Sequence, residues 1–341
     1  MPKAKVLVRA ASGGHARTLI LLGALCLVAL MLGGCSGESA GSDYPERDVE
    51  IMAPADPGGG WDQTARAMQS ALTEGGVIEE NVEVYNVGGA GGTIGLAQFV
   101  SDNVGDPHQL MVMGLVMLGA IETNDSPVDL SQATPIASLT TEWEAIVVPA
   151  ESEYQTLEQL VEAFRANPGS ISWAGGSAGG TDHILVGLLA QEAGVDPAEV
   201  NYIAHSGGGE AKAAILSGGV TAGVSGIAEF ADQVEAGQLR LLAVSSDEPI
   251  EGVDAPTIVE SGYNVTLPNW RGVMAPPDIS DEDRQAIISM IESMHDTPEW
   301  QETLEANDWT DFLQTGDEFA AYLDEENERV AAILSEMGLA R

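Results

Sequence analysis

Glycine-rich loops that lead directly into helix patterns are the feature that most constrains how this chain folds. They occur in four stretches, which read PADPGGGWDQTARAM, NVGGAGGTIGLAQFV, WAGGSAGGTDHILVG and IAHSGGGEAKAAI. Each loop follows a short run of strand-forming residues, so strands and helices alternate along the chain. Repeated strand–loop–helix units form a mostly parallel sheet that helices cover on both faces. The pattern therefore predicts an α/β protein whose glycine loops lie at the carboxyl ends of strands.

The strand patterns divide into two groups, each long enough for one sheet. The first group is at 49–51, 82–87, 109–114 and 134–148, and the second is at 171–173, 201–204, 220–224 and 239–244. The tail after 244 has too few strand patterns for a third sheet, so we expect it to return to the first. The chain is also longer than one compact core usually organises. We predict domain 1 at 48–145 plus 245–341, domain 2 at 146–244, and a hinge with two crossovers near Val147 and Val244.

The first residues have the pattern of an export signal. Four basic residues precede an apolar run that leads through Leu-Gly-Gly to Cys35. A cysteine at this position is typical of a bacterial lipoprotein signal, in which the thiol is acylated. An ordinary signal peptide and a single membrane anchor are the alternatives. We expect a lipoprotein signal peptide at 1–34, a flexible lipid-anchored tether at 35–47, and an extracytoplasmic protein that a lipid holds at the outer face of the cell membrane.

The charge balance excludes whole classes of partner. The chain has 13 Lys and Arg against 53 Asp and Glu, a formal net charge of −40, and loss of the signal peptide would leave nine basic residues. Such a surface repels nucleic acid and anionic lipid. The acids are scattered along the chain, as on a solvated surface. We expect a monomer that binds no nucleic acid, and we hypothesise that it works in high external salt, which screens self-repulsion.

Glycine loops at helix starts are suited to anion binding. The first turn of a helix presents unpaired N–H groups and partial positive charge, and glycine lets the backbone approach a ligand closely. Ligands of open α/β sheets bind beyond the carboxyl ends of the strands. The loops thus predict a small anion in a cleft between the two domains, although glycines that only make tight turns are the simpler alternative.

Nucleotide-binding and catalytic motifs fit the loops poorly. No loop has the Gly-Lys-Ser/Thr of a P-loop, and GGAGGTIG lacks the acidic residue that a dinucleotide fingerprint needs about twenty positions further on. The nearest approach to a hydrolase elbow surrounds Ser177, with His183 six residues beyond. No spacing of His, Asp and Glu is typical of a metal site. We expect no enzyme, cofactor or metal, and keep a secreted hydrolase that uses Ser177 as a less favoured alternative.

The same loops resemble the motifs of a known family. PADPGGGWDQTARAM resembles the Pro-Gly-Gly-x-x-Asp-x-x-Ala-Arg motif of TctC-type receptors, also called Bug proteins, which serve tripartite tricarboxylate transporters as extracytoplasmic solute receptors. NVGGAGG resembles their Asn-Arg-Pro-Gly-Ala-Gly-Gly motif, with Val87 and Gly88 in place of Arg-Pro. WAGGSAGGTDH, VNYIAHSGGG and WRGVMAPP resemble later motifs of the family. The similarity extends from about 48 to 341.

The resemblance implies a two-domain periplasmic-binding-protein fold, type II-like, that closes on a small di- or tricarboxylate and delivers it to membrane permease subunits. Carried over by position, the ligand-binding candidates are Gly58, Gly59, Gly60, Trp61, Gly91, Gly92, Thr93, Ser177, Thr181, His183, His205, Ser206 and Ser225. We expect Asp62 to cap the first helix and Arg66 to be its structural partner. The sequence leaves open which carboxylate is bound, and whether the receptor serves a permease or a sensor kinase.

Overall fold

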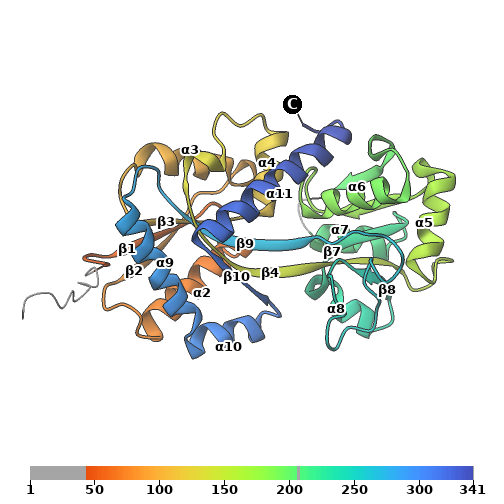
Figure 1. Cartoon of the computed structure of the whole chain (residues 1–341). Coiled ribbons are helices and arrows are strands. Elements are labelled where there is room, and N and C mark those ends of the chain that lie inside the picture. The colour runs from red at the N-terminus through yellow and green to blue at the C-terminus, as the bar shows by residue number, and fades with distance from the viewer. Residues whose placement is uncertain (1–43, 206–207, 341) are drawn as a thin grey trace, which may run out of the picture. The chain divides into compact units, whose positions relative to one another are not determined.

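The structure is a computed structural model that describes residues 44–205 and 208–340. The expected signal peptide, Cys35 and most of the expected tether lie outside the described residues, as does Ser206. The described residues from Tyr44 onward form one compact unit. Its strands form two sheets that share one long strand, β4 (Thr134–Pro149) (Figure 1). The strand predicted at 134–148 is therefore confirmed as a single element.

The first sheet combines parallel strands with antiparallel ones. Besides the first part of β4 it contains β1 (Val49–Ala53), β2 (Val82–Asn86), β3 (Gln109–Gly114), β9 (Pro268–Ala275) and β10 (Thr310–Thr315). β1 lies between β2 and β3 and is parallel to both. β9 is antiparallel to β3 and β4, and β10 is antiparallel to β4. The C-terminal tail thus returns to this sheet.

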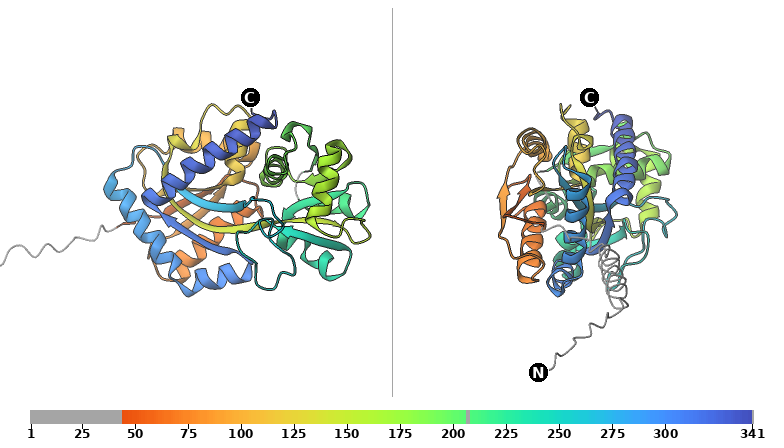
Figure 2. Two further views of the ribbon diagram at one scale, coloured as in Figure 1. Left: turned by 45° about the vertical axis from the view of Figure 1, so that its right-hand side comes forward. Right: turned by 60° about the vertical axis from the view of Figure 1, so that its left-hand side comes forward.

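Helices cover both faces of the first sheet (Figure 2). One face packs against α2 (Gly60–Glu74), α9 (Asp281–His295) and α10 (Pro298–Ala306), and the other against α3 (Thr93–Asp102), α4 (Leu115–Thr123) and α11 (Gly316–Glu336). The predicted apolar stripe of α2, formed by Ala65, Met68 and Leu72, is fully buried. Within the described ranges, no helix is long and apolar enough to cross a membrane.

The second sheet is built on the other part of β4. Its further strands are β5 (Ser172–Gly175), β6 (Asn201–Ala204), β7 (Ala222–Gly226) and β8 (Leu239–Val244). β5 is parallel to β6 and β7, whereas β4 is antiparallel to β7 and β8. α5 (Leu157–Ala166) and α6 (Thr181–Ala193) pack on one face, and α7 (Gly208–Leu216) and α8 (Ile227–Glu235) on the other.

The expectation of mostly parallel sheets holds only for the outer strands. β1, β2 and β3 are parallel to one another, as are β5, β6 and β7. β4, however, passes through both sheets in one direction and meets β7, β8, β9 and β10 as antiparallel neighbours. Both sheets are therefore mixed, because the strands that connect them cannot follow the parallel order of the strand–helix units.

Two places connect the sheets in the chain. β4 pairs with β9 up to Trp143 and with β7 from Glu144 onward. The chain returns where β9 begins at Pro268. Just before it, Ser245 accepts the Glu144 N–H at its Oγ (3.0 Å) and donates from that oxygen to the Leu267 carbonyl (2.8 Å). These bonds tie both ends of the segment 245–267 to the middle of β4. The domain boundaries expected from the sequence, 48–145 plus 245–341 and 146–244, stay a prediction.

Candidate ligand-binding site

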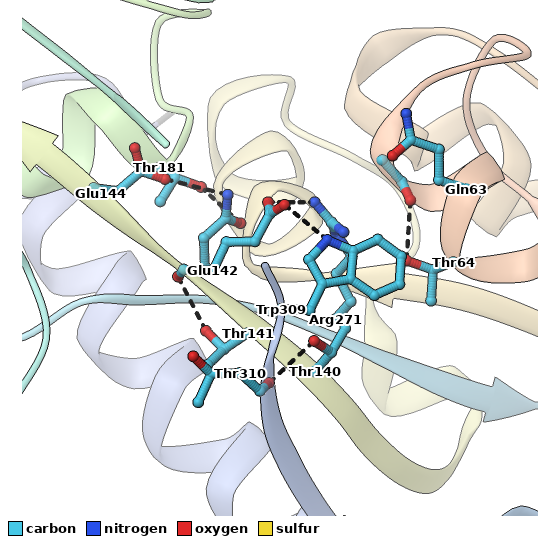
Figure 3. Close-up of polar contacts among 12 residues, drawn as sticks. Gln63, Thr64, Thr140, Thr141, Glu142, Glu144, Thr181, Arg271, Trp309 and Thr310 are labelled. Atoms are coloured by element: carbon cyan, nitrogen blue, oxygen red, sulfur yellow. Dashed lines mark hydrogen bonds and ion pairs between the residues drawn. The ribbon is translucent and has the colours of Figure 1, made fainter. Parts of the chain in front are cut away.

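A cleft of about 800 Å³ lies beside the part of β4 where the strand changes partners. Its walls are the loop before α2, the loop before α6, the start of α8, and residues of β4 and β9. Residues from 250–253 and 307–310 complete the lining. A cavity of this size suits a small organic ligand. Figure 3 shows the polar contacts among residues in and beside the cleft.

The loop before α2 holds its own N–H groups within the chain and leaves those of the first helical turn as donors. Gly58 has a φ of +89°, which favours glycine, and its N–H donates to Asp62 Oδ2 at 2.8 Å. The Gly59 N–H donates to the Asp56 carbonyl at 3.2 Å. α2 begins at Gly60, and the N–H groups of its first turn have no partner inside the helix. This end of α2 therefore presents donors and partial positive charge to an anion.

Asp62 fixes the shape of this loop. Its carboxylate is 3% exposed and accepts hydrogen bonds from the Gly58 N–H, from Asn86 Nδ2 at 2.9 Å and from Arg66 Nε at 3.1 Å. Burial alone would raise the pKa of Asp62, but these donors outweigh burial and lower the pKa below its ordinary value. The N-cap position belongs to Gly59. Asp62 thus holds the loop from inside the first turn, not from the cap position.

Arg271 places a guanidinium group in the cleft. It extends from β9, is 8% exposed and pairs with Glu142 at 2.5 Å. The guanidinium carbon Cζ lies over the ring of Trp309, 5.0 Å from the ring centroid. Trp309 Nε1 also donates to Glu142 Oε1 at 2.9 Å (Figure 3). A Cβ at Gly60 would lie 2.8 Å from Arg271 Nη2, so the loop can approach the guanidinium only because residue 60 is glycine.

The second nitrogen of this guanidinium is available. Arg271 Nη1 is buried and has no hydrogen-bond partner within residues 44–205 and 208–340. Burial lowers the pKa of Arg271, and the neighbouring Glu142 carboxylate opposes that effect. A guanidinium keeps its charge in such surroundings. Of the guanidinium atoms, Nη2, Cζ and Nε lie nearest to Gly60 at the start of α2, so this helix end and the guanidinium together give the cleft a positively charged corner that suits a carboxylate.

The loop before α6 forms the opposite wall. The Gly176 N–H donates to Asp182 Oδ2 at 2.6 Å, and the Gly180 N–H donates to the Ser177 carbonyl at 3.0 Å. Thr181 Oγ1 donates to Asn269 Oδ1 at 3.4 Å, which joins the start of α6 to β9. The loop is thus held in place by bonds within itself and by one bond to the strand that carries Arg271.

A group of carboxyl side chains occupies the same end of the cleft. Glu144 on β4 is 1% exposed; its Oε1 accepts from Asn269 Nδ2 at 3.2 Å, and its carboxyl group also shares a hydrogen bond with the Asp182 carboxyl group. Burial, followed by the charges of Asp182, Glu142 and Glu229, raises the pKa of Glu144 well above its ordinary value. Burial raises the pKa of Asp182 to about 6, against the Gly176 hydrogen bond. This end of the cleft therefore holds protons that ordinary surface carboxylates lose.

The structure brings only some of the predicted ligand-binding residues together. Those that line the cleft are Gly58, Gly59, Gly60, Ser177, Thr181 and Ser225. Those that lie outside its lining are Trp61, Gly91, Gly92, Thr93, His183 and His205. Ser206 lies outside the described residues. Among the described residues of the glycine loops, those before α2 and α6 contribute to the cleft.

The NVGGAGG loop packs against α4 and the ring of Trp61 and does not line the cleft. Residues 89–92 all have positive φ and form a tight turn into α3. A Cβ at Gly92 would lie 2.7 Å from Trp61 Cζ3 and 2.7 Å from Met117 Cε. The ring of Trp61 thus covers this loop, and the glycines make the close approach possible.

The two histidines predicted to bind the ligand, His183 and His205, instead make hydrogen bonds to the loop between β5 and α6. His183 Nδ1 accepts the Gly179 N–H at 3.1 Å, and its ring stacks on Tyr202 with centroids 3.9 Å apart. Burial lowers the pKa of His183 to about 4, so the ring is neutral. The His205 N–H donates to the Gly175 carbonyl at 3.0 Å. No hydrogen bond between Ser177 and either histidine occurs in the described part of the chain, so the hydrolase alternative gains no support.

Sequence reasoning missed the charged residues of the cleft. They are Glu142, Glu144, Asp182, Glu229, Glu251, Arg271 and Asp308. A signal was present, since TTEWEAIVV and NWRGVMA place charges inside otherwise apolar strand patterns. Such residues are rarely buried unless they are paired or bind something.

The strand arrangement and the cleft define the class of protein: this is the fold of the periplasmic binding proteins. A TctC solute-binding protein from Polaromonas superposes with a TM-score of 0.74 at 23% sequence identity, over 86% of this chain and 99% of that one. MatC from Rhodopseudomonas palustris with bound malate superposes with a TM-score of 0.68 at 20% identity, over 85% of this chain and 100% of that one. The predicted two-domain α/β fold class is confirmed.

Residues 63–339 match the family model described as the tripartite tricarboxylate transporter family receptor, and the chain belongs to this TctC family. Protein BugT of Bordetella pertussis is 25% identical over 318 residues, which are 89% of this chain and 94% of that protein. The resemblance seen in the sequence is thereby confirmed. Family and fold are those of extracytoplasmic solute-binding receptors, not of enzymes.

Proposed function

We propose that the protein is an extracytoplasmic receptor that captures a small organic carboxylate in this cleft and delivers it to a tripartite tricarboxylate-type permease. The observation that carries the proposal is the buried Arg271 Nη1, which lacks a partner among the described residues and belongs to a guanidinium that lies against Gly60 at the start of α2. A charged donor beside a helix N-terminus matches a carboxylate. Membership of the TctC family and the malate bound to MatC support the same ligand class.

The proposed cycle uses both halves of the molecule. Loops of both sheets line the cleft, so a ligand that contacts both stabilises a closed arrangement over an open one. We take 48–145 plus 245–341 as the first domain and 146–244 as the second. The closed receptor, a monomer held at the outer face of the membrane by a lipid on Cys35, then docks on the permease subunits.

A calorimetric panel tests the receptor function. The purified protein is heated alone and with succinate, malate, adipate, citrate or an amino acid. Binding to the folded state alone adds about 2.7 kcal/mol to the free energy of unfolding at a ligand concentration of 100 Kd. We expect at least one acid to raise the Tm clearly, and mass spectrometry of the co-purified small molecule identifies further candidates. A panel in which no acid changes the Tm, with no acid co-purified, would contradict the proposal.

Paired variants test the anchoring role of Arg271. Arg271→Gln loses a charge-assisted hydrogen bond of about 1.5–3 kcal/mol, so we expect the Kd of the bound acid to rise about tenfold or more. The double variant with Glu142→Gln avoids leaving the Glu142 carboxylate unpaired in the cleft. Arg47→Gln is the matched control, since Arg47 pairs with Asp106 and does not line the cleft. Equal affinity in all three variants would exclude Arg271 as the anchor.

A further inference from the structure

α11 runs from the half built on the first sheet to the half built on the second, on the side of β4 away from α2 and α8 (Figure 1). Its early turns are fixed to β9. The rings of Phe319 and Tyr322 meet the ring of Trp270 edge-on, with centroids 5.9 and 5.5 Å apart. Glu326 Oε2 also accepts a hydrogen bond from Trp270 Nε1 at 3.1 Å. This part of α11 therefore belongs to the first half.

The other end of α11 packs on α6 in the second half. A Cβ at Gly187 of α6 would lie 2.5 Å from Met337 Sδ and 3.2 Å from Ile333 Cγ1, so the two helices approach this closely because residue 187 is glycine. Met337 and Ile333 are buried by the contact and its surroundings. At the surface, Gln191 Nε2 donates to the Glu336 carboxylate at 3.1 Å. α11 thus connects the two halves.

α4 of the first half contacts the second half on the same side. A Cβ at Gly119 would collide with the Gly179 carbonyl oxygen in the loop before α6 and would lie 3.5 Å from Ile184 Cδ1. Side chains of α4, α6 and α11 share one apolar cluster, which includes Leu118, Ile184 and Ile333. The two halves therefore bury apolar surface against each other here, and this burial stabilises their present arrangement.

The side of β4 that carries α2 and α8 is different. Among the residues described, the apolar cluster beneath α2, α9 and α10 belongs to the first half alone, and the cluster beneath α7 and α8 belongs to the second half alone. The starts of α2 and α8 line the cleft. β4 lies between the two sides and changes its partners at Trp143. A rotation about this point that brings α8 toward α2 therefore carries α6 away from α11 and α4.

We propose, building on the receptor function proposed above, that this contact is a latch: the packing of Met337, Ile333 and Gly119 on α6 opposes closure of the cleft, and ligand binding has to break it. These residues lie outside the lining of the cleft. They nevertheless affect the affinity, because the observed Kd is the Kd of the closed form divided by the fraction of molecules that are closed. Weakening the latch raises that fraction, so it tightens binding although it removes packing.

Two variants weaken the latch in different ways. Met337→Ala removes the side chain that lies against Gly187, and Gly187→Leu adds a side chain where even a Cβ would lie 2.5 Å from Met337 Sδ. Gly187 does not have positive φ, and leucine is a good helix former, so the backbone of α6 accepts the change. Met290→Ala is the matched control, because Met290 on α9 is buried in the cluster of the first half and does not line the cleft. It should lower the free energy of unfolding and leave binding unchanged.

Titration calorimetry measures the Kd of whichever acid of the panel, succinate, malate, adipate or citrate, raises the Tm of the wild type. We expect the Kd to fall about threefold or more in Met337→Ala and in Gly187→Leu, and to stay unchanged in Met290→Ala. Small-angle X-ray scattering in the absence of acid reports the direction of the change. Both latch variants should have a smaller radius of gyration than the wild type, nearer to that of the wild type saturated with acid.

The outcomes separate the latch from the receptor function. A Kd that is unchanged or raised in both latch variants would overturn the latch and leave the receptor standing, because α11 and α6 would then keep their contact in the closed form. A larger radius of gyration in the latch variants than in the wild type would also overturn it. If Gly187→Leu does not fold, Met337→Ala decides alone. Binding of no acid by the wild type or the variants would overturn the receptor function and the latch with it.

Discussion

Replacing Gly60 by alanine tests whether the α2 loop and Arg271 form one anion site. The new Cβ would lie 2.8 Å from Arg271 Nη2 and 3.0 Å from Cζ, whereas ordinary contacts begin at 3.4 Å. The guanidinium must therefore retreat by roughly 0.6 Å from the loop. Such a shift moves the guanidinium away from the amides with which it would share a carboxylate.

Gly60→Ala should raise the Kd of the acid strongly and change the free energy of unfolding little. Loss of one charge-assisted hydrogen bond costs about 1.5–3 kcal/mol, which weakens the Kd about 10- to 150-fold. Gly60 does not have positive φ, so alanine fits its backbone and restricts the unfolded chain, a gain of about 0.4–1 kcal/mol. The displaced side chain offsets part of that gain. We expect the free energy of unfolding to change by less than about 1 kcal/mol.

Titration calorimetry with the acid identified by the panel measures the Kd, and urea unfolding measures stability. Gly169→Ala is the matched control, because a Cβ there meets no atom within 4 Å and residue 169 does not line the cleft. A Gly60→Ala protein that binds as the wild type does would refute the idea that the loop and the guanidinium act together. A protein that no longer folds would show that the contact is structural.

Three further predictions concern stability. Burial raises the pKa of Glu144, and that of Asp182 to about 6, so the unfolded state loses these protons at lower pH than the folded state and stability falls as the pH rises above the ordinary carboxyl pKa. Glu144→Gln should therefore gain stability relative to the wild type as the pH rises from 5 to 7 in urea titrations, and an unchanged difference would contradict the shift. Asp62→Ala should lower the free energy of unfolding by about 2–4 kcal/mol in urea unfolding, because the Gly58 N–H and Asn86 Nδ2 lose Asp62 as their acceptor. Arg66→Ala should lower it by under about 1 kcal/mol, because the side chain of Arg66 is half-exposed. With a formal net charge of −40, the Tm should rise from low to molar NaCl, and a flat response would argue against salt adaptation.

Local patterns predicted most of the fold, and the gaps have physical causes. The strands at 109–114 and 134–148 were found because their apolar runs end at clear breaks. α4 was missed because it follows β3 in one continuous apolar run, in which helix and strand periods cannot be separated. β10 was missed because it exists through its pairing with β4, a neighbour about 170 residues away in the chain.

The candidate site was predictable in part for a similar reason. A glycine loop at a strand end can be read from the sequence, and the loops before α2 and α6 do line the cleft. The sequence cannot show that Gly92 packs against Trp61 and Met117, so that the NVGGAGG loop makes contacts within the fold and does not line the cleft. A valine at Gly91 would therefore not test ligand binding. Gly91 has a φ of +62°, and a Cβ at this position would lie 2.5 Å from Ala120 Cβ, so Gly91→Val disturbs the fold itself.

The course of β4 places the cleft next to the point about which the two halves of the proposed receptor would rotate. Glu142 and Glu144, which line the cleft, flank Trp143, the residue at which this strand passes from β9 to β7. If the halves rotate about this point on binding, the ligand acts on the pivot itself and needs no relay of side chains to reach it. A small change of backbone dihedral angles at this point would then displace the distant surfaces of both halves by a larger amount, and these are surfaces to which a permease can bind.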